Sequence, residues 1–66
     1  MSKAILTAVA KFTELKPDKN YKLSALVILC EDYVASNADI TSEDDFFDFL
    51  FSMSFLPNFE ELVLAN

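Results

Sequence analysis

Residues 42–56 read SEDDFFDFLFSMSFL and join a helix start signal to a long aromatic run. A serine or threonine at the N-cap accepts hydrogen bonds from free backbone N–H groups, and acids in the first turn are favoured by the helix dipole. Thr41 or Ser42 is therefore predicted to cap a helix that runs to about Leu56 and stops at Pro57. This helix carries most of the information about the fold.

The predicted helix is apolar around most of its circumference. At 100° per residue its polar side chains fill an arc of only about 60°, whereas a helix docked on one side of a core needs an apolar stripe of about 100°. Its apolar side chains form two ridges. The first ridge is expected to face the core and consists of Phe46, Phe49, Leu50 and Met53. The second ridge consists of Phe47, Phe51 and Phe55.

Two interpretations of the second ridge are open. It could pack against a final helix, or it could join Phe59 as a surface that binds another protein. We expect the second arrangement, because large exposed apolar patches mark association sites and aromatic residues are enriched at interface cores. The expected apolar anchors are Phe47, Phe51, Phe55 and Phe59, and the expected acidic rim is Asp44, Asp45 and Asp48.

Two more helices are predicted before this segment. Residues 2–15 place most of their apolar side chains on one side of a helix and most of their charges opposite, which predicts an amphipathic helix. Pro17 breaks this helix, and Asn20 is available to cap the next one. Residues 21–37 are long enough for that second helix, but a buried strand at residues 26–30 is an alternative that periodicity leaves open.

A short final helix is predicted after Pro57. Asn58 is positioned as its cap, with Glu61 in the capping-box position. A chain of 66 residues is too short for two hydrophobic cores. The sequence therefore predicts an all-α fold, with one small acidic helical domain over residues 1–66. The expected architecture is a compact bundle of three main helices with a short C-terminal fourth.

The chain is acidic, and its charges are unevenly distributed. It has 11 acids against five lysines, which gives a formal net charge of −6. All five lysines lie within residues 1–22, whereas residues 23–66 contain nine acids and no base. Direct nucleic-acid binding is not expected, because basic side chains are needed to neutralise phosphates. The acids could solubilise an apolar surface, steer a basic partner onto the aromatic ridge, or imitate phosphates.

The composition argues against catalysis. The chain has no His, no Gly and a single Cys. It therefore lacks the usual general base, the cysteines for a thiolate cluster and the glycines of a phosphate-binding loop. Cys30 is predicted to be a small buried hydrophobe, since its nearest charges in sequence, Glu31 and Asp32, disfavour a thiolate. We expect no enzyme activity, no cofactor and no metal site.

These observations favour a protein-binding function. We expect a small module that regulates or inhibits a larger protein by stoichiometric contact through the aromatic surface. In size and charge the chain resembles the small acidic regulators and inhibitors of phages and other mobile elements. One alternative is a nucleic-acid mimic that occupies the basic groove of a DNA- or RNA-handling protein, and another is a self-assembling structural subunit.

The hydropathy of the sequence and its many apolar residues set expectations for the location and the oligomeric state of the protein. No apolar run approaches the length of about 18 residues that a membrane span requires, so no membrane partner is expected. A cytoplasmic location is the expectation. Because much of the surface is apolar for so small a chain, we also expect a homo-oligomer, such as a homodimer, or a subunit bound to a larger protein.

Overall fold

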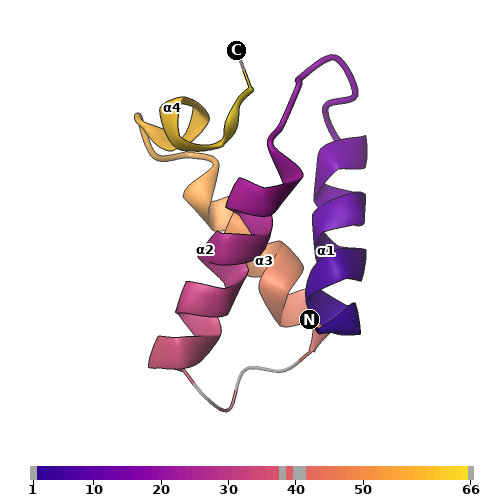
Figure 1. The fold of residues 1–66 in the computed structure, drawn as a ribbon, viewed down its shortest axis with the longest axis vertical. Helices are drawn as coiled ribbons and strands as arrows, with labels where there is room; N and C mark the ends of the chain where they lie inside the picture. The colour runs from indigo at the N-terminus through magenta and orange to yellow at the C-terminus, as the bar shows by residue number, and fades with distance from the viewer. Residues whose placement is uncertain (1, 38, 40–41, 66) are drawn as a thin grey trace.

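The computed structural model describes residues 2–37, 39 and 42–65, and these residues form four helices (Figure 1). The helices are α1 (Lys3–Glu14), α2 (Leu23–Ser36), α3 (Glu43–Met53) and α4 (Phe59–Val63). No β-strand occurs in the described part of the chain, apart from one isolated bridge between two residues. The prediction of an all-α bundle is confirmed, and the strand alternative for residues 26–30 is wrong.

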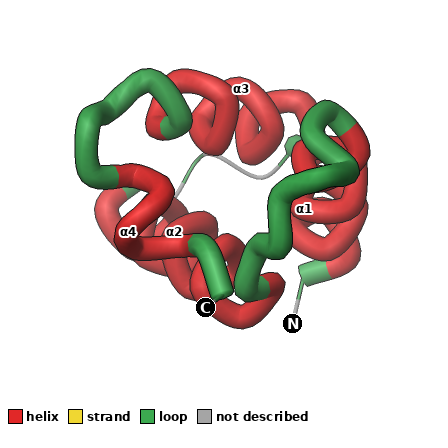
Figure 2. Tube along the Cα trace, turned by 90° about the horizontal axis from the view of Figure 1, so that it is seen from above, coloured by secondary structure: helices red, strands yellow, loops and turns green. Residues whose placement is uncertain are grey.

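The three main helices pack around one core. α1 and α2 lie side by side and run in opposite directions, while α3 crosses behind them (Figure 1). Seen from above, α1, α2 and α3 surround the centre of the molecule, and α4 packs against α2 (Figure 2). The C-terminal ends of α1 and α3 both point toward the end of the bundle where α4 lies (Figure 1).

The start of α2 differs from the prediction. The helix begins after Lys22, and Asn20 does not cap it. Residues 20–22 pair instead with the C-terminal segment. The Lys22 N–H donates to the carbonyl oxygen of Val63 at 2.6 Å, and the Ala65 N–H donates to the carbonyl oxygen of Asn20 at 2.7 Å. This long-range pairing uses the backbone that a helix starting at residue 21 would need.

The start of α3 is as predicted, but its end is not. Ser42 is the N-cap, and the helix ends at Met53 rather than at Leu56. At this end, the Ser54 hydroxyl donates a hydrogen bond to the carbonyl oxygen of Phe51. Such local bonds from serine side chains compete with the helical pattern. The residues that follow form turns.

α4 is held in place by Phe59. Asn58 occupies the N-cap position but makes no side-chain capping hydrogen bond, so the predicted capping box is not formed. The Phe59 side chain is only 1% exposed, and its ring centroid lies 5.9 Å from that of Phe12 and 6.4 Å from that of Tyr21. The prediction of Phe59 as an exposed interface anchor is therefore wrong, because this ring fills the core between α1 and α4.

The first ridge of α3 faces the core, as predicted. Phe46 and Leu50 are buried, and Phe49 and Met53 are partly buried against the same cluster. The Phe49 ring stacks on that of Tyr33 at 4.1 Å between centroids. The buried side chains of the core are Ile5, Ala8, Val9, Phe12, Tyr21, Leu26, Val27, Cys30, Phe46, Leu50, Phe59 and Val63. They come from all four helices and from the segment that precedes α2.

Candidate protein-interaction surface

The second ridge of α3 remains largely at the surface. Phe51 is 45% exposed and Phe55 is 74% exposed, while Phe47 is partly buried against the core. The rings of Phe47 and Phe51 are nearly parallel, with centroids 6.3 Å apart, and Phe51 meets Phe55 edge to face at 5.1 Å. Three rings that were predicted to act together are therefore contiguous in space.

The position of α4 explains why this ridge is uncovered. α4 packs on α2, and its first residue, Phe59, inserts toward Phe12 and Tyr21. The interpretation in which the second ridge packs against the last helix is therefore wrong for Phe51 and Phe55, which keep much of their surface exposed. Both rings therefore add apolar area to the surface of the folded chain.

A pocket of about 300 Å³ opens beside these rings. It lies between the end of α1 and the end of α3, and it is lined by Phe12, Leu15, Lys16, Tyr21, Phe51, Ser54 and Phe55. Phe12 and Tyr21 are its buried residues, whereas Leu15 is 52% exposed. We call Leu15, Phe51 and Phe55 the aromatic patch, since these three exposed apolar side chains surround the pocket.

Two of the three predicted rim acids lie on the same side of α3 as Phe51. At 100° per residue, Asp44 and Asp48 are about 20° and 60° from Phe51 around the axis of α3, whereas Asp45 is about 120° away. Both Asp44 and Asp48 are exposed. Along the helix, Asp48 precedes Phe51 by about one turn and Asp44 by about two turns, so Asp48 is the nearer of the two to the patch.

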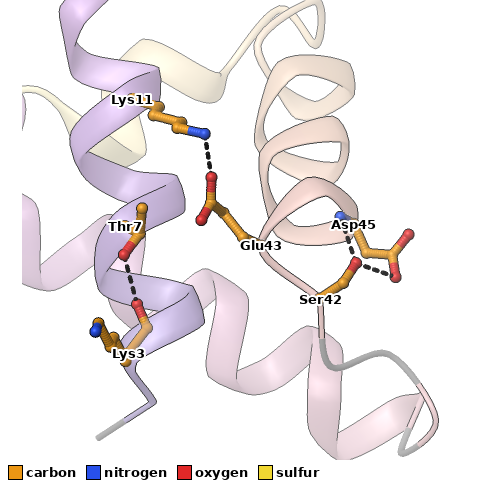
Figure 3. Close-up of polar contacts among 6 residues, drawn as sticks. All are labelled: Lys3, Thr7, Lys11, Ser42, Glu43 and Asp45. Atoms are coloured by element: carbon orange, nitrogen blue, oxygen red, sulfur yellow. Dashed lines mark hydrogen bonds and ion pairs between the residues drawn. The ribbon is translucent and has the colours of Figure 1, made fainter.

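Asp45 has a structural role at the start of α3 (Figure 3). Its backbone N–H donates to the Ser42 Oγ at 3.2 Å, and the Ser42 hydroxyl donates to its Oδ2 at 2.7 Å. These two bonds tie the first turn of the helix to its cap. The carboxylate of Asp45 is thereby engaged within the chain, although it stays exposed.

Acidic groups outnumber bases along the line where α1 meets α3. Lys11 donates to the carboxylate of Glu43, and this bond joins the two helices (Figure 3). The hydrogen bond from Lys11 to Glu43, followed by the charge of Glu43, raises the pKa of Lys11 above its ordinary 10.5, and Asp44 and Glu14 add to the shift. Three carboxylates thus surround a single ammonium group at this position.

A second ion pair engages another lysine. Lys19, in the loop after α1, contacts the carboxylate of Glu60 in α4 at 3.1 Å. The hydrogen bond and the charge of Glu60 raise the pKa of Lys19. Two of the five lysines and two of the 11 acids are therefore paired within the chain, and the formal net charge stays −6.

Sequence reasoning missed Leu15 and the pocket. Leu15 belongs to the apolar side of the helix predicted for residues 2–15, but it follows the last helical residue of α1 and lines the pocket together with residues at the end of α3. Its position just before the break at Pro17 is the signal that could have separated it from the stripe. Other exposed apolar side chains, such as Ile28 at 55%, lie outside this pocket.

Neither a candidate metal site nor a membrane-spanning helix is present among the residues that the structure describes. No group of three or more His, Cys, Asp or Glu side chains could hold a metal ion among residues 2–37, 39 and 42–65. Within the same residues, none of the helices has the length and apolar character required to cross a membrane. Comparisons with known protein families, with curated proteins and with solved structures found no match to this chain.

Proposed function

We propose that this chain is a small acidic protein-binding module that regulates or inhibits a larger protein by stoichiometric contact through the aromatic patch. The observation that carries the proposal is the exposure of two contacting phenylalanine rings, Phe51 and Phe55, beside a pocket. Interface hot spots are aromatic side chains that become fully desolvated beside a pocket. Leu15 adds a third apolar contact from a different helix end.

The acids of α3 support the idea that charge orients the partner on the aromatic patch. Asp44 and Asp48 are exposed on the same side of α3 as Phe51, where they are available to a partner that contacts the patch. Rim charges of this kind mainly raise association rates and select partners of opposite charge. The module thereby combines an apolar contact that supplies affinity with an acidic edge that supplies selectivity.

The proposal is tested by capture of tagged protein from its source cell with matched surface variants. Phe55→Ser removes the most exposed ring of the patch, and Ile28→Ser removes a comparably exposed side chain elsewhere. We expect an equimolar partner to be captured by the parent and by Ile28→Ser, with at least about tenfold less in Phe55→Ser. Circular dichroism of each variant verifies that the helices are retained.

Regulation is tested on the captured partner itself. Its activity is measured while the parent protein is added, and the effect should saturate at one equivalent and be lost with Phe55→Ser. Equal capture and equal effect by Phe55→Ser and Ile28→Ser would contradict the proposal.

The nucleic-acid mimic predicts a different pattern of loss. Asp44→Asn together with Asp48→Asn would then abolish binding, and Phe55→Ser would leave it unchanged. Asp45 is left intact in this variant because it supports the helix cap through Ser42. Under the proposed function, the double variant slows association and weakens its salt dependence while the complex still forms.

A further inference from the structure

We infer that the pocket receives one large apolar side chain from a basic segment of the partner, in which lysines or arginines flank the inserted residue. This inference rests on the proposed function and names the chemistry of its partner. It follows from two features of the same site, the apolar lining of the pocket and the acidic character of its surroundings.

The residues that line the pocket are mostly apolar, so they favour the insertion of an apolar side chain. Phe12 and Tyr21 are buried in the pocket, and the aromatic patch supplies the remaining apolar walls. A cavity of about 150 Å³ accommodates benzene, so a pocket of about 300 Å³ has room for a side chain as large as an indole. The ring of Phe55, which is 74% exposed, is free to close against such a side chain.

Acidic residues near the pocket favour basic residues on either side of the inserted side chain. Asp48 precedes Phe51 by about one turn of α3 and Asp44 by about two turns, and exposed Glu14 directly precedes Leu15. The positive charge of Lys11 is already paired with Glu43. Lys16 is the one charged residue that lines the pocket, so the acids that would meet a basic segment lie outside the lining, on α3 and at Glu14. Opposite charge on the incoming segment makes the contact electrostatically complementary.

A second copy of the chain is a poorer occupant. Two copies that met through the aromatic patch would each bring the acids of α3 and Glu14 to the edge of the contact. Each copy also carries a net charge of −6. Like charges across an interface oppose association and suppress wrong partners. A basic segment meets the same patch without this repulsion.

The test uses a short synthetic peptide with one central tryptophan between lysines. The chain contains no tryptophan, so the fluorescence of the peptide reports its own environment directly. We expect a blue shift of the emission that saturates at one equivalent of protein. The affinity should fall about tenfold in Phe55→Ser and stay unchanged in Ile28→Ser. It should also fall in Asp44→Asn with Asp48→Asn.

A matched peptide with glutamates in place of the lysines should cause no shift. Equal binding of the acidic peptide, or equal binding of the basic peptide to Phe55→Ser and Ile28→Ser, would overturn the inference. A dimer in sedimentation that dissociates in Phe55→Ser would also overturn it, because the occupant would then be a second copy.

Failure of this inference is distinguishable from failure of the proposed function. If the basic peptide does not bind while capture of a protein still depends on Phe55, the function stands and the chemistry assigned to the partner is wrong. If capture is unchanged in Phe55→Ser, the proposed function fails whatever the peptide does.

Discussion

Cys30 is the residue whose chemistry is most strongly altered by the fold. Its side chain is buried in the core, and this burial, with a smaller contribution from the charge of Glu31, raises the pKa of the thiol from an ordinary 9.0 to about 11. We predict that iodoacetamide leaves the native thiol unmodified at about pH 8 and modifies it fully in urea, because the thiolate is the reactive species. Mass spectrometry measures the modified fraction. Rapid modification of the native protein would contradict the burial of this thiol.

The same shift makes stability depend on pH. Between pH 9 and about 11, the thiol is ionised in the unfolded chain but still protonated in the folded chain, so unfolding releases a proton. The free energy of unfolding should therefore fall as the pH rises through this window. Urea titrations of the parent and of Cys30→Ala measure the effect, and the variant should show a shallower fall. Parallel slopes would assign the loss to other groups, such as the Lys11 ion pair.

The cap of α3 acts at the scale of a single helix. Ser42→Ala removes the side-chain acceptor of the Asp45 N–H and the donor to its carboxylate, and we predict a loss of about 1 kcal/mol in the free energy of unfolding. Ser42→Thr keeps a hydroxyl at the same position and serves as the control, with most of the stability retained. Urea denaturation measures both. An equal loss in the two variants would show that the hydroxyl bonds are not the cause.

Local signals explain which elements could be predicted. The cap and first turn of α3 lie within four adjacent residues, Ser42 to Asp45, so the sequence contains all the groups that form them. The contacts among the rings of Phe47, Phe51 and Phe55 were predictable for the same reason. These residues are spaced four apart, about one helical turn, and the contacts extend past the end of α3 into the turn that contains Phe55. The elements and most of the aromatic surface were predictable for this reason.

Long-range contacts explain the remaining differences. Asn20 does not cap α2, because residues 20–22 pair with residues 63–65 near the opposite end of the chain. Phe59 lies in the core, because α4 folds back onto α2 and brings this ring against Phe12. The pocket forms where two helix ends meet. Periodicity within one segment contains no information on these three contacts.

The C-terminal segment completes the core and the hydrogen bonding of the whole molecule. Phe59 and Val63 contribute buried side chains, and the segment that contains them makes backbone hydrogen bonds with residues 20–22. A chain of this length buries only about 60% of the surface that it exposes when unfolded. Few buried contacts can be lost from so small a core before the folded state becomes marginal, so a buried ring such as Phe59 and an exposed ring such as Phe55 should differ strongly in their effect on stability.

Phe59 and Phe55 provide the clearest test of this division. Phe59→Ala should lower the free energy of unfolding by about 3–5 kcal/mol, because it leaves a cavity in the core. A domain of this length has a total stability of about 3–10 kcal/mol, so this variant should be largely unfolded or strongly destabilised. Phe55→Ala should change stability by no more than about 0.5 kcal/mol, because its ring is mostly in solvent.

Thermal denaturation followed by circular dichroism measures both variants under the same conditions. The comparison controls for residue type, since each variant removes one phenylalanine ring. If Phe55→Ala proved as destabilising as Phe59→Ala, the ring of Phe55 would belong to the core, and the aromatic patch would lose its main anchor. A stable Phe55→Ala protein that no longer binds its partner would instead separate folding from binding within two phenylalanines that are four residues apart in the sequence.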